Sequence, residues 1–244
     1  MPGFMYHGSF THAPDNLNLI LKLEPNPTCI LRVGVNLDNE VHMAEQRALR
    51  ADARRNMEKL LDAARDVFCD RGLGAPLDAI ATRAGVSIGT LYNRFPTREA
   101  LIEAALPDLV CREMQAVADH ALAQPTPWRR FAAYLEGLCS LATADHAISD
   151  VITGAQYNST ALNAVCDDSF ALAKSLIAEA QADGSLRDDV TFDDVFMEYW
   201  LNAQLGEHAG PEAAAMSRRH IGIVLDGLRA AAATPLPAKD ASSR

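Results

Sequence analysis

Apolar residues recur at helical spacing along nearly the whole chain from Ala44 onward. The clearest stripe places Met57, Leu60, Ala64 and Phe68 at i, i+3, i+7 and i+11, which is the period of one face of an α-helix. From Ala44 onward, no segment alternates apolar and polar positions with the period of two that is typical of strands. The earlier segment CILRVGV is the single strand candidate. The pattern predicts an all-α protein.

Three short helices are predicted in succession, over residues 54–71, 77–84 and 88–94. Gly85 permits a tight turn between the second and third helices, and Ser87 is a residue type that caps helix N-termini with its side-chain oxygen. Two short helices joined by such a turn form a helix-turn-helix, whose second helix enters the major groove of DNA. The sequence therefore predicts an N-terminal three-helix DNA-binding domain.

Helical patterns continue to residue 232, separated by proline, glycine or short polar stretches. They predict a helix over 97–120 that is broken or kinked at Pro107, a helix that begins after Thr126, and helices near 145–156, 159–182, 192–208 and 211–232. We expect four regions: a poorly ordered extension over 1–43, the helix-turn-helix DNA-binding domain over 44–106, a C-terminal helical ligand-binding and dimerisation domain over 107–233, and a flexible tail over 234–244.

Charge is distributed unevenly along the 244 residues. The net charge of −10 by itself argues against a nucleic-acid partner. Residues 44–106, however, carry ten basic and nine acidic groups, whereas residues 107–244 carry ten basic and nineteen acidic groups. Arg47, Arg50, Arg54 and Arg55 stand close together at the front of the predicted DNA-binding domain. Such a run is either a solvated helix start or an arm that contacts DNA phosphates, and composition leaves both open.

The third short helix has two faces of different character. Ile88, Leu91 and Phe95 lie at i, i+3 and i+7 and are predicted to anchor the helix on apolar residues of the first two helices. The residues between them are small or polar, as a surface that enters a DNA groove must be. The alternative is an ordinary exposed face of a small helix. The capped turn, the slim outward face and a tyrosine within one short block favour the DNA-binding interpretation.

Each outward residue type has a contact that it can make with DNA. Gly89 removes a side chain where the backbone approaches closely. Asn93 can pair bidentately with adenine, and the methyl group of Thr90 can touch the methyl group of thymine. Tyr92 can donate its hydroxyl to a phosphate. The sequence therefore assigns base contacts to Thr90 and Asn93 and backbone contacts to Tyr92.

The flanks of this helix supply charge and amide donors. Arg94 and Arg98 carry positive charge, and the free amides at the start of the helix that follows Thr97 can hold a phosphate. The predicted DNA-binding residues are Arg54, Ser87, Ile88, Gly89, Thr90, Tyr92, Asn93, Arg94, Thr97 and Arg98.

The block LLDAARDVFCDRGLGAPLDAIATRAGVSIGTLYNRFPTREALIEAAL resembles the DNA-binding domain of the tetracycline-repressor (TetR) family of transcriptional regulators. The resemblance covers about residues 53–106. It implies a homodimer whose two DNA-binding domains contact a palindromic operator on double-stranded DNA, with repression as the family default. Arg98 stands where a phosphate-contacting lysine is commonest in the family, and Arg94 where the family often has histidine.

The C-terminal half is similar to the SbtR-type regulatory domains of the same family, in the segments WRRFAAYLEGLCSL, LIAEAQADGSLRDDVTFDDV and RRHIGIVLDGL. The resemblance implies that the last two helices join those of a second chain in a four-helix bundle. The residues agree, because FMEYWLNAQL and HIGIVLDGLRA are both strongly apolar. A monomer would struggle to cover both helices, so the sequence favours a symmetric dimer face.

The resemblance also implies an unidentified small-molecule effector among the central helices. A ligand changes the separation of the two DNA-binding domains only if it binds one arrangement more tightly than the other. We expect the helix over 97–120 to act as the lever, because it belongs to one domain and leans on the other. The candidate pocket residues are Trp128, Tyr134, Tyr157, Phe170 and Phe196.

Other classes of function are disfavoured. The chain contains no G-x-S-x-G, H-E-x-x-H, phosphate-binding loop or complete dinucleotide motif, and its histidines lack metal-ligand spacing. We therefore expect no enzymatic activity, no cofactor and no metal. A regulator that lacks a small-molecule ligand, or that acts through a protein partner, remains the alternative.

The cellular location is inferred from cysteine usage and hydropathy. The five cysteines are widely spaced without a C-x-x-C pair, as expected for unpaired thiols in a reducing compartment. No apolar run is long enough to span a membrane. We expect a cytoplasmic bacterial protein that acts at the nucleoid, with no membrane partner.

Overall fold

A computed structural model describes residues 37–153 and 159–236. Within these ranges it contains ten α-helices and two short 3-10 helices, and the β-structure there is limited to one isolated bridge between Leu186 and Arg229. The all-α prediction is therefore confirmed. The predictions for residues 1–36, for the CILRVGV strand candidate, for Tyr157 and for the end of the tail lie outside the described residues.

Helix α1 (Leu37–Arg71) ends where the helix predicted over 54–71 ends, but it begins much earlier, before even Ala44, where helical periodicity starts in the sequence. The stretch from Leu37 to Met43 contains neither proline nor glycine, so nothing in it interrupts a helix. The chain divides into two compact units, of which the first ends at Arg54 and the second begins at Arg55. In the first unit, the described side chains of α1 are mostly exposed.

In the second unit, α2 (Leu77–Ala84) and α3 (Ile88–Arg94) have the bounds that the sequence predicts. Gly85 adopts the left-handed conformation, with φ of 70°, which few other residue types adopt without strain. Its amide donates to the Thr82 carbonyl at 3.1 Å, and this bond closes the end of α2. Ser87 then caps α3 by accepting the Thr90 amide at 3.2 Å. These local bonds define a helix-turn-helix.

Apolar side chains of α1, α2 and α3 form one buried cluster. Phe68, Ile80 and Leu91 are fully buried, and Phe95 is nearly so. Ile88 packs against this cluster while remaining half-buried. The predicted anchor of α3 is therefore confirmed.

The helix predicted over 97–120 is two helices, α4 (Arg98–Ala105) and α5 (Pro107–Leu122). Proline has no amide hydrogen, so Pro107 cannot continue the hydrogen-bond ladder of α4 and instead begins α5. Leu106 at the junction is fully buried and keeps a right-handed helical conformation. Thr97 caps α4 by accepting the Ala100 amide at 3.1 Å.

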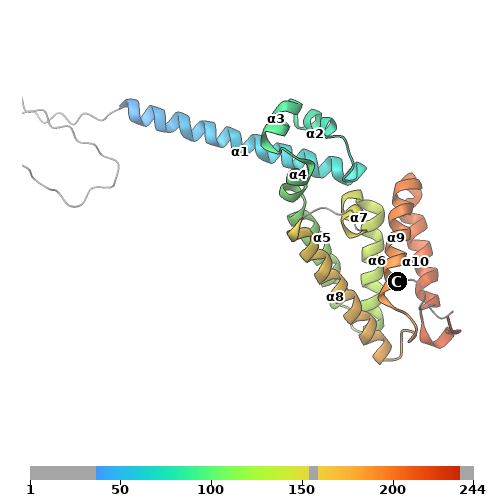
Figure 1. The fold of residues 1–244 in the computed structure, drawn as a ribbon. Coiled ribbons are helices and arrows are strands. Elements are labelled where there is room, and N and C mark those ends of the chain that lie inside the picture. Colours follow the sequence, from blue (N-terminus) through green and yellow to red (C-terminus); the bar gives the residue numbers. More distant parts are fainter. Residues whose placement is uncertain (1–36, 154–158, 237–244) are drawn as a thin grey trace, which may run out of the picture. The chain divides into compact units, whose positions relative to one another are not determined.

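The C-terminal helices are α6 (Pro127–Ala144), α7 (His146–Ile152), α8 (Thr160–Ala182), α9 (Phe192–His208) and α10 (Ala213–Gly227). Helix α6 packs against α5, α7, α8, α9 and α10, and Figure 1 shows it among them. The predicted helix over 211–232 is shorter than expected. A 3-10 turn at Gly210–Glu212 precedes α10, and Arg229 turns to an extended conformation before a second 3-10 turn at Ala230–Ala232.

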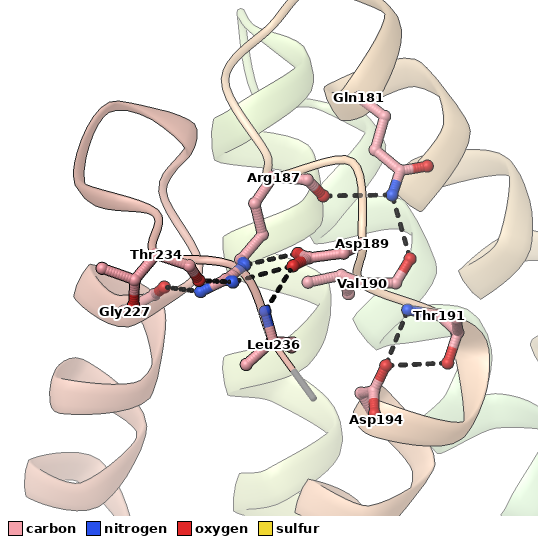
Figure 2. A network of polar contacts seen from close by, with 9 residues as sticks. All are labelled: Gln181, Arg187, Asp189, Val190, Thr191, Asp194, Gly227, Thr234 and Leu236. Atoms are coloured by element: carbon pink, nitrogen blue, oxygen red, sulfur yellow. Dashed lines mark hydrogen bonds and ion pairs between the residues drawn. The ribbon is translucent and has the colours of Figure 1, made fainter. Parts of the chain in front are cut away.

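The segment after α10 is held against the loop between α8 and α9 by the nearly buried Arg187 (Figure 2). Its guanidinium donates to both carboxylate oxygens of Asp189, at 2.6 and 2.9 Å, and to the carbonyls of Gly227 and Thr234. Asp189 in turn accepts the Leu236 amide at 3.0 Å. The adjacent guanidinium lowers the pKa of the Asp189 carboxyl well below its usual range. The end of α10 is thus tied to the α8–α9 loop.

The same loop is fixed from the α8 side. The Gln181 side-chain amide donates to the carbonyls of Arg187 and Val190, at 3.1 and 2.9 Å (Figure 2). Thr191 and Asp194 form a capping box at the start of α9, in which the Asp194 carboxylate accepts the Thr191 amide at 2.8 Å. This capping box sets where α9 begins.

Candidate DNA-binding surface

Helix α3 turns one face into the protein and the other to solvent. Leu91 is fully buried, whereas Tyr92 is 48% exposed and its neighbours Asn93 and Arg94 are exposed as well. Thr90 is exposed one residue before Leu91. The structure therefore gathers five of the ten predicted contact residues on one outward surface, which we call the α3 face: Gly89, Thr90, Tyr92, Asn93 and Arg94.

Gly89 is not required by the fold of the free protein. A Cβ atom built at this position meets only Ser87 Oγ, at 3.8 Å, which is ordinary van der Waals contact. Gly89 also does not occupy the left-handed region that favours glycine. The space in front of it is open, so its lack of a side chain leaves room for another molecule.

Ser87 and Thr90 form a local pair at the start of α3. Besides accepting the Thr90 amide, Ser87 Oγ lies 2.9 Å from Thr90 Oγ1, close enough for a hydrogen bond between the two hydroxyls. The pair restrains the Thr90 side chain, because a bonded hydroxyl selects among the staggered rotamers. A restrained side chain loses less conformational entropy when it contacts a partner.

Arg98 has a role that the sequence did not predict. Its Nη1 atom donates to the carbonyls of Leu73 and Ala75, at 2.7 and 2.6 Å, and ties α4 to the loop between α1 and α2. Sequence patterns gave no signal for these bonds, because the partners lie more than twenty residues away. Phosphate contact by Arg98 stays a prediction beside this observed role.

The other predicted DNA contacts fall in two places. Ser87 and half-buried Ile88 begin α3, and exposed Thr97 precedes α4 close behind it in the chain. Arg54 is exposed on α1 at the end of the first compact unit.

The four predicted pocket residues that the structure describes do not line one cavity. Trp128 packs against Phe131, with ring centroids 5.9 Å apart, and the Arg229 guanidinium lies 4.3 Å from its ring centroid. Tyr134 is buried elsewhere on α6, where its hydroxyl donates to the Ser169 carbonyl on α8 at 2.9 Å. Burial raises the pKa of Tyr134, which therefore remains a neutral phenol.

Phe170 and Phe196 pack together with Phe192 in a third location, between α8 and α9. Ring centroids in this aromatic cluster lie 5.2 to 6.1 Å apart, a separation typical of favourable aromatic pairs. The space beside the cluster has a volume of about 20 Å³, which is room for about one water molecule. Phe170 and Phe196 are thus partly buried and pack against the core.

A larger cleft lies between α5, α6 and α8, beside Tyr134. Its volume is about 200 Å³, and its lining joins the apolar residues Met114 and Leu172 to the polar residues Gln115 and Asp168. Of the lining residues, only Tyr134 was among the pocket residues predicted from the sequence. The others could not be found from spacing, because three helices distant in sequence contribute them.

The four cysteines in the described ranges are unpaired thiols. Burial and the nearby Asp145 carboxylate raise the pKa of the Cys69 thiol to about 12, so this side chain stays protonated and unreactive. No group of histidine, cysteine and carboxylate side chains among the described residues could hold a metal ion. In the same part of the chain, no helix is both long and apolar enough to cross a bilayer.

The fold and the α3 face define a helix-turn-helix DNA-binding protein with a C-terminal helical domain. Two family profiles match the chain: bacterial regulatory proteins of the tetR family over residues 60–105, and the C-terminal domain of SbtR-like transcriptional regulators over residues 126–230. The chain belongs to the TetR family of transcriptional regulators. The family consists of DNA-binding regulators rather than enzymes.

Individual relatives agree with this assignment. A TetR transcriptional regulator from Streptomyces coelicolor is 33% identical, over 70% of this chain and 97% of that one, with a TM-score of 0.45. The transcriptional repressor KstR of Mycobacterium tuberculosis is 26% identical over 190 residues, which cover 77% of this chain and 83% of KstR. The ketosteroid transcriptional regulator KstR2 of the same species has the same fold, with a TM-score of 0.52 at 19% identity over 72% of this chain and 95% of KstR2.

Proposed function

We propose that this regulator is a repressor that binds a palindromic operator as a homodimer, and that a small-molecule ligand releases it. The observation that carries the proposal is the α3 face, where exposed polar side chains surround an open glycine on a helix anchored by fully buried Leu91. The related protein KstR is named a repressor, which supports repression here. We assign DNA binding to residues 44–106, and ligand and dimer contacts to residues 107–233.

Exposed apolar side chains on α9 and α10 support the homodimer. Met197, Trp200 and Leu201 lie at i, i+3 and i+4 on α9, and Met216 and Ile223 lie at i and i+7 on α10. These spacings place each set on one side of its helix, and the two helices pack against each other. We call these five residues the dimer face. An apolar surface of this kind marks an interface, and a second copy covers it by two-fold symmetry.

The cleft beside Tyr134 is the site we propose for the ligand. It combines apolar walls with a few polar groups, as small-molecule sites do. Helix α5 forms one wall and follows α4 directly at Leu106, so a ligand that moves α5 also moves the base of the helix-turn-helix. Screening metabolites for release of a bound duplex tests this step, and no release by any compound that binds the cleft would contradict it.

A repressor without a ligand is the second candidate. The cleft volume of about 200 Å³ is smaller than the roughly 300–1,000 Å³ of most ligand sites. The two candidates differ in one measurement. In a ligand-responsive protein, bound DNA lowers the affinity for the small molecule, and the bound small molecule lowers the affinity for DNA by the same factor. A repressor without a ligand shows neither effect.

Tyr92→Ala should weaken binding to all operators alike. The proposed contact of the Tyr92 hydroxyl is with a phosphate, which carries no sequence information. We expect the dissociation constant to rise about tenfold, by a similar factor for each of several duplexes selected from genomic DNA by the wild-type protein. Fluorescence anisotropy at fixed salt measures this, and a changed ranking of the duplexes would contradict a phosphate contact.

Asn93→Ala should instead change which duplex is preferred. Loss of a base-reading side chain costs about 1–3 kcal/mol on the preferred sequence and little on sequences that differ at the contacted pair. Repeating the selection from a random library with the variant measures this directly, with Tyr92→Ala as the matched control. Uniform weakening on all sequences would show that Asn93 does not read a base.

A further inference from the structure

A carboxylate of the C-terminal helices binds the loop between α1 and α2. Asp150 on α7 accepts the backbone amide of Leu73 at 2.7 Å through Oδ2, across 77 residues of sequence. Leu73 is fully buried, so its amide has no access to water and depends on this carboxylate. A hydrogen bond to a charged acceptor is stronger than one between neutral groups.

The backbone carbonyl of Leu73 is bound by the DNA-binding domain. The Leu73 carbonyl accepts Nη1 of Arg98 at 2.7 Å, and Arg98 is the first residue of α4, shortly after the end of α3. Leu73 is therefore a bridge whose amide is bound by α7 and whose carbonyl is bound by α4. The bridge links the C-terminal helices to the base of the α3 face.

Gly72 makes room for this arrangement. It ends α1 with φ of +73°, and a Cβ atom built on it would lie 2.6 Å from Asp150 Oδ2. Other residue types would both strain the backbone and displace the carboxylate. The turn thus admits Asp150 as well as ending the helix.

Helix α7 is itself fixed by helices of the proposed ligand and dimer region. The Tyr199 hydroxyl on α9 donates to the Ile148 carbonyl at 3.3 Å, and the Cys166 thiol on α8 lies 3.9 Å from the Val151 carbonyl. Tyr199 belongs to the same helix as the dimer-face residues Met197 and Trp200. Asp150 therefore lies on a helix that is bonded to α9, one of the two helices of the proposed dimer face.

We propose that Asp150 is a positioning residue for DNA binding: its bond to Leu73 fixes the helix-turn-helix against α7, so that the two copies of α3 in the dimer stand at operator spacing. The inference rests on the proposed homodimer. Two DNA-binding domains must lie about 34–36 Å apart to enter successive major grooves. If the DNA-binding domain can rotate freely, its orientation must be fixed when the dimer binds both half-sites, and this costs entropy. Affinity for the full palindrome therefore falls, whereas affinity for a single half-site does not change.

The test compares two duplexes of equal length, one with the palindrome recovered by selection and one with a single intact half-site. For Asp150→Ala we expect about tenfold weaker binding to the palindrome and unchanged binding to the half-site duplex. Asp150→Asn keeps an acceptor oxygen in the same place and should retain most of the affinity for the palindrome.

Asp167→Ala removes an exposed carboxylate on α8 and serves as the matched control. Hydrogen exchange at the Leu73 amide should accelerate in Asp150→Ala only.

Three outcomes would overturn the inference. Equal affinity of Asp150→Ala and wild type for both duplexes, while the Leu73 amide exchanges faster, would show that the bond does not position the domain. Weaker binding of Asp150→Ala to both duplexes would indicate a local folding defect instead. A wild-type protein that is monomeric, or that binds both duplexes equally, would remove the proposed homodimer and the inference with it.

Discussion

Gly89→Glu should abolish specific DNA binding while leaving the fold intact. The free protein has room for the side chain, because the nearest atom to a built Cβ is Ser87 Oγ at 3.8 Å. Replacing glycine favours the helix, and an acidic group in the first turn of α3 interacts favourably with the helix dipole. In the DNA complex the same side chain would occupy the space of the duplex and repel phosphates. Contacts worth about 1–3 kcal/mol are lost at each of two sites, so affinity should fall about a hundredfold or more.

Anisotropy with a selected operator duplex and thermal unfolding by circular dichroism measure the two halves of this prediction. Ala178→Glu adds the same charge on the exposed side of α8, away from the α3 face, and should leave affinity nearly unchanged. A Gly89→Glu protein that is folded and still binds the operator at wild-type affinity would show that this face does not meet DNA.

The second large effect is expected from charges in the dimer face. Met197 and Ile223 are 54% and 63% exposed, so Met197→Glu and Ile223→Glu together should be tolerated by a folded monomer. In a symmetric dimer they would bury four unpaired carboxylates, each of which costs several kcal/mol. We expect a monomer at micromolar concentration. Operator affinity should fall about a thousandfold, because a monomer carries one DNA-binding domain and cannot bind both half-sites at once.

Sedimentation equilibrium gives the oligomeric state, and Leu122→Glu is the matched control, since Leu122 is an exposed leucine on α5 outside the dimer face. The control should remain dimeric. If the double variant stays dimeric while folded, the two-fold interface lies elsewhere on the chain and the assignment of α9 and α10 is wrong.

The helix-turn-helix was predictable because its boundaries are local. Gly85 ends α2 and Ser87 caps α3 through bonds that span at most five residues, so the residue types alone indicate both ends. The buried face of α3 was predictable for the same reason, since the spacing of Leu91 and Phe95 is a property of one helix. Membership of the TetR family followed from this block and is confirmed.

Features that depend on distant segments could not be predicted. Trp128, Tyr134 and Phe170 were grouped as pocket residues because they are aromatic, yet the fold places them in separate environments. The bonds that Arg98 and Asp150 make with the α1–α2 loop join residues 23 to 77 positions apart. No periodicity or motif reports such contacts, because only the packing of several helices brings the partners together.

The most direct test of the central claim is protection of guanine N7 atoms from methylation on the selected operator, since N7 lies in the major groove. We expect two protected patches on one duplex, about 10 base pairs or a multiple of that apart from centre to centre, and we expect both to be lost with Gly89→Glu. A duplex that is bound by the wild-type protein without major-groove protection, or with a single patch, would contradict the central claim.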